Sequence, residues 1–586
     1  MARLDPHSYA DAAQPQVTRL GWKARVDFDA KVIEAEARLE LESPGEGPLD
    51  LDTRDLTIHG VFAESGEKLA YELAAAEPVL GSRLRVNLPK GTRALRIAYR
   101  TSPQATALQW LTPAQTAGGK HPFLFSQCQS IHARSVVPLQ DSPRVRVRYQ
   151  AEVTVPVELK AVMAAGAVRR DEKGKLAVDV FEMPQAIPPY LFALAVGHLV
   201  SRDVGPRSRV WAEPEIVEKA KWEFEDVDKM ILAAEKLFGP YDWDRFDILT
   251  MPPSFPYGGM ENPRLTFLTP TLLAGDRSLV NVLAHELAHS WTGNLVTNAN
   301  ADHFWLNEGF TVWAERRIQE ALEGKEVSGL HAALGRQSLE KAIADFKDHP
   351  EWTRLRTDFA GVDPDEAYSQ VPYEKGYLFL RTIEEAVGRP AFDAFLRQYI
   401  EAFRFKSITT EDFTCFVQDK LPGVLEKVNA TEWIDGPGIP ANAPKAVSTK
   451  LEALQAIGAK APADDLAKSW TPAEWSLYLE ALPHPAPKVL CEELDRRFSL
   501  SKSGNYEVLV SWLGLAAISG YEAAIPKVEE VLGKVGRMKY LKPLYTALVK
   551  VEATRPNARR CFERNADGYH PIARGGIEGI LKKNQA

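Results

Sequence analysis

Two histidines and two glutamates at fixed spacing constrain this chain more than any other feature. His285 and His289 bracket Glu286 in the pentad HELAH, and Glu308 follows nineteen residues after the second histidine. On a helix, positions i and i+4 project from one face, so both imidazoles can reach one metal ion. Glu308 can add an anionic ligand, and three protein ligands with an open position are typical of catalytic zinc. Since Glu286 is available as a base toward water, the pattern predicts a hydrolase with one zinc ion per chain.

The segments around these residues have helical periodicity. Leucines recur at i+4 intervals on the side opposite the histidines: Leu279, Leu283 and Leu287. We expect Asp276 or Ser278 to cap the start of this helix and Gly293 to end it. A second helical pattern begins near residue 307. Glu315 lies seven residues after Glu308 on the same face, where it could orient a ligating histidine.

The length and the patterning predict a multidomain α+β protein. At 586 residues the chain exceeds one hydrophobic core, and about three domains are expected. Residues 1–203 alternate in hydrophobicity between Gly, Pro and Asp turns, which predicts an all-β domain. Residues 204–436 mix helical and short strand patterns and contain the HELAH pentad. A Gly- and Pro-rich linker over 437–446 precedes an all-α domain over 447–586.

Composition excludes several classes of partner. The net charge of -8 and the pI near 5.9 argue against nucleic acid or an anionic membrane as the main partner. No run approaches the roughly eighteen apolar residues that cross a bilayer. The first residues lack a charged and then apolar signal region, and the four cysteines are scattered. We therefore expect a cytoplasmic monomer with reduced thiols.

The segment FPYGGMENP, residues 255–263, is the next informative one. Its adjacent glycines, Gly258 and Gly259, let backbone N–H groups approach a substrate carbonyl closely. Glu261 adds a fixed anion nearby. Taken alone, two glycines before a polar residue more often form an ordinary turn.

Taken together, these motifs resemble the zinc aminopeptidases typified by aminopeptidase N and leukotriene A(4) hydrolase. The resemblance to the leukotriene A(4) hydrolase type is closer and extends along the chain. Its segments occur in order: SQCQSIHARSVVPLQDSP, PYGGMENPRLTFLTPTLL, HELAHSWTGN, DHFWLNEGFTVW, DPDEAYSQVPYEKG and GRMKYLKPLY. The resemblance implies a saddle-like β domain, a thermolysin-like (gluzincin) catalytic domain and a helical C-terminal domain.

The resemblance also implies roles for individual residues. His285, His289 and Glu308 would bind zinc, Glu286 would act as the base, and Tyr373 would donate a hydrogen bond to the developing oxyanion. It implies substrate binding by Gln129, Tyr257, Gly258, Gly259, Met260, Glu261, Asp365, Tyr368, Arg537 and Lys539.

Within this set the implied tasks differ. Glu261 and Gln129 would hold the free α-amino group, which fixes the cut one residue from the chain end. Arg537 and Lys539 would meet the carboxylate of a short peptide. Asp365 and Tyr368 would line the pocket for the first side chain or for a lipid chain, and an aspartate there would suit a basic residue.

The leading interpretation is an aminopeptidase that acts on short peptides with a free N-terminus. One alternative is hydrolysis of a lipid epoxide of the leukotriene A(4) type in the same site. An endopeptidase is a second alternative, against which Glu261 argues. A silent binding scaffold is a third, and the intact ligand set with Glu286 argues against it.

Overall fold

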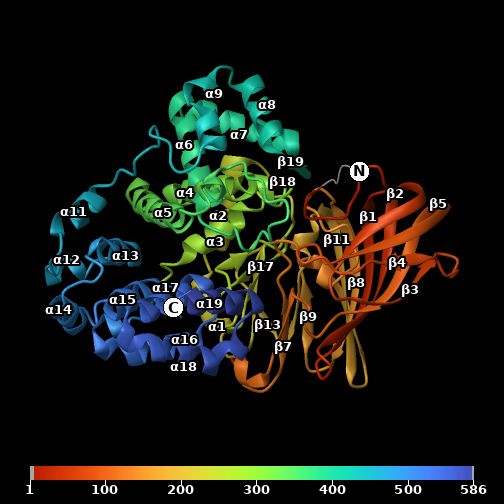
Figure 1. Ribbon diagram of the computed structural model, residues 1–586, viewed down its shortest axis with the longest axis horizontal. Coiled ribbons are helices and arrows are strands. Elements are labelled where there is room, and N and C mark those ends of the chain that lie inside the picture. Colours follow the sequence, from red (N-terminus) through yellow and green to blue (C-terminus); the bar gives the residue numbers. More distant parts are fainter. Residues whose placement is uncertain (1–4, 584–586) are drawn as a thin grey trace.

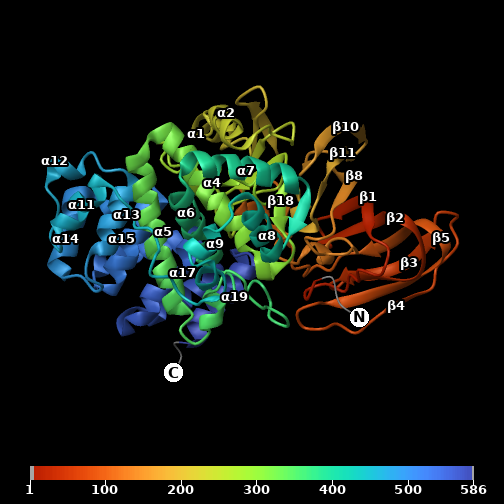
Figure 2. The same ribbon diagram turned by 90° about the horizontal axis from the view of Figure 1, so that it is seen from above.

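The computed structural model describes residues 5–583. Along the chain, a β-sheet region is followed by a central mixed region and then by a bundle of helices (Figure 1). In both views most of the strands lie on one side of the central region and the C-terminal helices on the other (Figure 2). The predicted order of an all-β, a mixed and an all-α region is therefore confirmed.

Two sheets build the N-terminal region. The large sheet has eight strands in the order β10-β11-β8-β1-β2-β5-β3, with β4 also paired to β5, and only its β1–β8 pair is parallel. The smaller sheet has the order β6-β7-β12-β9. Buried positions alternate along β8, as expected for a strand with one face in the core. The strands of the large sheet are β1 (Val17–Asp27), β2 (Val32–Thr53), β3 (Thr57–Ala63), β4 (Tyr71–Leu73), β5 (Ser82–Arg100), β8 (Val147–Pro156), β10 (Gly166–Lys173) and β11 (Leu176–Ile187). Those of the smaller sheet are β6 (Leu108–Leu111), β7 (Phe123–Ser126), β9 (Lys160–Met163) and β12 (Leu194–Gly197).

The central region packs helices beside a five-stranded sheet of order β13-β14-β15-β17-β16. The short strand β16 forms one edge of this sheet and runs antiparallel to β17. The strands are β13 (Val200–Asp203), β14 (Arg209–Ala212), β15 (Asp247–Thr250), β16 (Gly259–Met260) and β17 (Leu265–Leu268), with a separate pair β18 (Val296–Asn298) and β19 (Lys406–Ile408). The helices are α1 (Val217–Glu223), α2 (Val227–Phe238), α3 (Val280–Ala288), α4 (Trp305–Glu323), α5 (Lys325–Asp345), α6 (Gly376–Val387), α7 (Arg389–Phe403), α8 (Thr410–Lys420), α9 (Val424–Lys427) and α10 (Ala430–Asp435).

The C-terminal region is helical throughout. It consists of α11 (Thr449–Ile457), α12 (Asp464–Ala467), α13 (Pro472–Ala481), α14 (Lys488–Phe498), α15 (Tyr506–Ile518), α16 (Ile525–Lys534), α17 (Met538–Lys550), α18 (Arg555–Asn565) and α19 (Pro571–Lys583). Its apolar side chains form their own cluster, which also takes in Leu330 and Ala333 of α5. A second cluster runs from the N-terminal sheets into the central region. Helix α5 therefore joins the C-terminal bundle to the central region. Within the described residues, no helix has both the length and the apolar character that crossing a membrane requires.

Candidate zinc site

Helix α3 places His285 on its polar face, and His289 follows as its C-cap residue. The three leucines of the predicted stripe, Leu279, Leu283 and Leu287, are buried. The cap predictions were wrong: α3 starts without a side-chain cap, because Asp276 Oδ1 instead accepts hydrogen bonds from Ser278. The helix also ends at Ala288, before Gly293. Burial of the leucine stripe, rather than capping, therefore holds this helix in place.

Three lone-pair-bearing atoms converge between α3 and α4. Nε2 of His285 and Nε2 of His289 lie 3.2 Å apart, and Oε2 of Glu308 lies 3.3 and 3.6 Å from them. Nδ1 of His285 faces Glu315 at 3.0 Å, and Nδ1 of His289 faces the Thr292 carbonyl at 3.1 Å. Since both of these partners accept, each Nδ1 carries a proton and each Nε2 presents a lone pair. Acceptors that converge without a donor fit a cation, and imidazole and carboxylate ligands suit zinc.

Further buried carboxylates surround this point. Burial raises the pKa of Glu286 well above its usual value, and the charges of Glu261 and Glu308 add to this effect. Burial likewise raises the pKa of Glu261 to about 7. Together with His289, these two glutamates form a second, overlapping group of possible metal ligands. The surplus of buried acid is a further reason why a cation fits here.

The edge strand β16 runs directly beside Glu286. A side chain at Gly259 would collide with the Glu286 carboxylate, and one at Gly258 would come within 2.6 Å of Nη2 of Arg537. A side chain at either position would therefore displace Glu286 or Arg537 from its place beside β16. Because an edge strand offers free backbone groups, β16 can pair with an extended peptide between Glu286 and Arg537. Met260, the second residue of β16, is buried against the β domain, where Gln127 contacts its sulfur at 3.1 Å.

The side chains of Glu261 and Gln129 lie next to each other where β16 ends after Met260. Nε2 of Gln129 lies 3.4 Å from Oε1 of Glu261, and the Glu261 side chain is 3% exposed. The Glu261 carbonyl accepts a hydrogen bond from Nδ2 of Asn294 at 2.7 Å. The structure thus brings together the two residues that the resemblance pairs, although they come from different regions of the chain.

The hydroxyls of Tyr368 and Tyr373 lie 2.9 Å apart. Tyr373 belongs to a single π-helical turn, Val371–Lys375, and its ring stacks 6.1 Å from that of His285. The ring of Tyr257 lies 6.0 Å from that of Tyr368. All three tyrosines therefore surround the same space as the candidate ligands.

Three expected substrate residues have internal partners that the sequence did not indicate. Glu507 contacts both Nη1 of Arg537, at 3.4 Å, and Nζ of Lys539, at 2.7 Å. Asp365 accepts hydrogen bonds from His132 and Ser130. Ser130 and His132 lie in a segment that carries the family resemblance, but neither they nor Glu507 could be paired with their partners from sequence, because those partners are distant in the chain.

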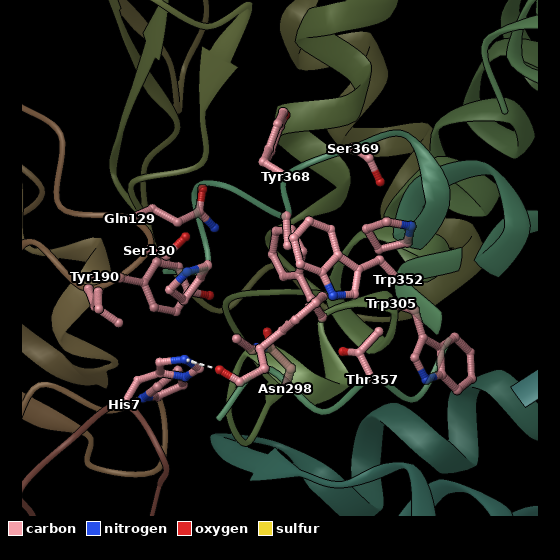
Figure 3. A pocket seen from close by; sticks show the side chains of 18 of the residues that line it. His7, Gln129, Ser130, Tyr190, Asn298, Trp305, Trp352, Thr357, Tyr368 and Ser369 are labelled. Atoms are coloured by element: carbon pink, nitrogen blue, oxygen red, sulfur yellow. Dashed lines mark hydrogen bonds between the residues drawn. The ribbon is translucent and has the colours of Figure 1, made fainter. Parts of the chain in front are cut away.

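A cavity extends from this site toward the β domain. Gln129 and Tyr368 lie at the top of the view in Figure 3, and His7 lies at the bottom. The wall is largely aromatic and aliphatic, formed in part by Phe304, Trp352 and Leu355. Since Gln129 lines the cavity and also contacts Glu261, the cavity borders the place where the α-amino group of a peptide is expected.

Comparisons with known proteins match all three regions of the chain. The Peptidase M1 N-terminal domain matches residues 6–191, the Peptidase family M1 domain matches 222–433, and the leukotriene A4 hydrolase C-terminal domain matches 470–581. Leukotriene A-4 hydrolase of Xenopus laevis is 39% identical and the match covers 97% of each chain. Leucine aminopeptidase 2 of Yarrowia lipolytica is 41% identical over 91% of this chain and 86% of its own length. The structure of yeast LTA4 hydrolase in complex with bestatin superposes with a TM-score of 0.91, at 34% identity, over 99% of this chain and 97% of that one.

The fold and the site therefore define a zinc metallopeptidase, a hydrolase that acts on peptide bonds. More particularly, the chain belongs to peptidase family M1 and has the C-terminal domain of the leukotriene A4 hydrolases. The family predicted from the motifs is thus confirmed.

Proposed function

We propose that this protein is a zinc aminopeptidase that removes single residues from short peptides with a free N-terminus. The observation that supports this most is the buried pair of Glu261 and Gln129, next to the candidate base Glu286. A carboxylate and an amide oxygen at this depth can hold one ammonium group, and they leave little room for a longer chain upstream. The enzyme would therefore cleave the peptide bond after the first residue of the substrate.

Each residue has a task in this mechanism. His285, His289 and Glu308 would hold zinc, which when bound supplies a Lewis acid and lowers the pKa of a water molecule. Glu286 would take a proton from a water molecule and pass it to the leaving amine. Tyr373 donates a hydrogen bond to the oxyanion as it develops, and its position beside Tyr368 orients the hydroxyl.

The remaining residues position the substrate. The edge strand β16 pairs with the peptide backbone, and Tyr257 and Tyr368 flank the first residue. Arg537 lies beside Gly258 at the far end of β16, with Lys539 close by. These cations can meet the carboxylate of a di- or tripeptide, which supports short substrates.

A second candidate function is hydrolysis of a lipid epoxide. The aromatic cavity favours it, since its wall could take an acyl chain. A relative that matches nearly the whole chain is named leukotriene A-4 hydrolase. Incubation with leukotriene A(4) and analysis of the diol product tests this activity independently of peptide cleavage.

A panel of aminoacyl-arylamides, run with and without a chelator, tests the leading proposal. We expect turnover of free-amine substrates, loss of turnover on chelation and recovery with added zinc. N-acetylated versions should be cut far more slowly. Equal rates on blocked and free substrates would contradict an aminopeptidase and favour an endopeptidase.

The proposal also covers the domain boundaries, the cellular compartment, the oligomeric state and the partners. We propose domain boundaries at 436/437 and 446/447; for the first boundary, expected at 203/204, the pairing of β13 (Val200–Asp203) with β14 favours a position just before Val200. All four cysteines, each within the described residues, are free thiols, which supports a reducing compartment such as the cytoplasm. We propose a monomer that holds one zinc ion. We propose no nucleic acid or membrane partner, as the acidic net charge suggests.

A further inference from the structure

A second cavity lies between helices α4, α5 and α6 and the segment that leads to the C-terminal helices. It has a volume of about 270 Å³, and none of its described lining residues borders the cavity beside Gln129. The described residues of its wall include seven arginines or lysines, against two glutamates, Glu320 and Glu385. A concave wall with this excess of cations attracts anions. Its volume suits a small molecule rather than a folded partner.

Carboxylates hold arginines of this wall in fixed positions. Arg317 donates two hydrogen bonds to Asp393, at 2.7 and 3.0 Å, and its side chain is 9% exposed. Arg389 donates to Glu384 at 2.7 Å and to Glu320 at 2.6 Å. Because these guanidinium groups are ordered without a ligand, little side-chain entropy is lost when an anion binds beside them.

Arg316 is the most buried cation of the wall, with a side chain 6% exposed. Its Nη2 donates to both carboxylate oxygens of Glu374 at 2.8 Å, and its guanidinium lies 3.9 Å from the centre of the Tyr377 ring. Its Nε and Nη1 have no hydrogen-bond acceptor among the described residues. Buried N–H groups are normally paired, so an acceptor from outside the chain would suit this part of the wall.

The uncompensated charge of the wall comes from two lysines. Lys325 and Lys445 are exposed, and neither forms an ion pair within the part of the chain that the structure describes. Lys325 and Arg389 are also the first residues of α5 and α7, and neither helix starts with a side-chain cap. Both helix dipoles therefore add positive potential at this wall. Two unpaired ammonium groups match the charge of about -2 that a phosphate group carries near neutral pH.

We propose that this cavity binds a phosphate group, either as the free ion or as the phosphate monoester of a small molecule. Arginine and lysine donors on several sides suit the oxygens of a tetrahedral anion. Lys445 belongs to the segment before the C-terminal helices, so a bound phosphate would tie this segment to α5. The inference goes beyond the proposed peptidase function and does not depend on it.

Isothermal titration calorimetry of the zinc-loaded protein, with inorganic phosphate and with glucose 6-phosphate, tests the proposal. We expect a dissociation constant below about 1 mM for at least one of the two. Glucose, and sodium chloride at the same ionic strength, should give no binding isotherm. Tighter binding of glucose 6-phosphate would identify an ester as the ligand, and tighter binding of phosphate the free ion. Either result supports the site.

Variants of the wall assign the binding to this cavity. Lys325→Met combined with Lys445→Met removes the unpaired charge and should weaken binding at least about tenfold. Glu385→Gln removes an anion from the wall and should tighten binding about twofold or more, a gain that damage to the fold cannot produce. Lys219→Met combined with Lys347→Met changes two exposed lysines elsewhere and should leave the dissociation constant unchanged.

Two results would overturn the inference. One is the absence of binding by both phosphate probes up to about 10 mM. The other is binding that the two double lysine variants and Glu385→Gln leave equally unchanged, because the phosphate would then occupy another site such as the zinc centre. Peptide cleavage enters neither measurement, so failure of the proposed peptidase function would be seen separately.

Discussion

The Glu315 carboxylate accepts a hydrogen bond from Nδ1 of His285 at a distance of 3.0 Å. Glu315 lies two helical turns after Glu308 on α4, so one helix supplies both a candidate zinc ligand and the group that orients another. The bond fixes the tautomer of His285 and aims its Nε2 at Glu308 and His289. The geometry of the site therefore depends on the packing of α3 against α4.

We predict that Glu315→Gln weakens zinc binding by about tenfold to a hundredfold, because an amide orients the imidazole less strongly and lowers its basicity. Competition with a chromophoric chelator measures the affinity directly. Glu323→Gln, an exposed change on the same helix, is the control and should leave the affinity unchanged. Equal affinities for both variants would show that Glu315 does not support the ligand.

The candidate zinc ligands could be identified from the sequence because their geometry is mostly local. The i, i+4 spacing on α3 and the i, i+7 spacing on α4 hold wherever these segments are helical. The apolar stripe of Leu279, Leu283 and Leu287 could also be predicted from the sequence, and all three residues are buried. The cap of α3 was predicted wrongly, because Asp276 pairs with Ser278 and the helix starts one residue later.

Contacts between distant segments could not be predicted in this way. His132 and Asp365 are 233 positions apart, and no periodicity relates them. The pairing of Gln129 with Glu261 followed only from resemblance to a family, and Glu507 was missed altogether. The first two contacts form where one domain packs on another, and Glu507 reaches its partners from a separate helix of the C-terminal region, so the fold must be known first.

We predict that Glu286→Gln retains zinc and loses catalysis. The change removes the proton acceptor but none of the three candidate ligands, so kcat should fall about a hundredfold or more. Metal analysis and steady-state kinetics on one preparation test both halves of the statement. A variant that keeps more than about a tenth of the wild-type kcat would rule out Glu286 as the base.

We predict that Glu261→Ala impairs free-amine substrates selectively. Loss of a buried charge-assisted contact to the ammonium should lower kcat/KM for such substrates by about tenfold or more. The slow cleavage of N-acetylated peptides should hardly change, since they carry no ammonium. Glu366→Ala, an exposed change near the same cavity, is the matched control. Equal losses on blocked and free substrates would show that Glu261 does not bind the α-amino group.

We predict that Tyr373 contributes more to kcat than its partner Tyr368. Tyr373→Phe removes the donor aimed at the oxyanion and should lower kcat by about a hundredfold to a thousandfold with little change in KM. Tyr368→Phe removes only the partner that orients this donor, so a loss of about fivefold is expected. The kcat values of the two variants, measured on one arylamide, show which hydroxyl contributes more to catalysis. A larger loss for Tyr368→Phe would assign the oxyanion contact to that residue instead.

We predict that Arg537 recognises the free carboxylate of short peptides. Its Nη2 lies against the backbone of Gly258, and Glu507 and Tyr540 hold its Nη1 from behind. Arg537→Met should therefore raise KM for a tripeptide about tenfold or more, while kcat stays nearly constant. The same tripeptide as a C-terminal amide should change by less than about threefold, since it offers no carboxylate. Arg560→Met, an exposed change on α18, should alter neither substrate. If the acid and the amide lose affinity equally, Arg537 supports the fold of β16 rather than the end of the peptide.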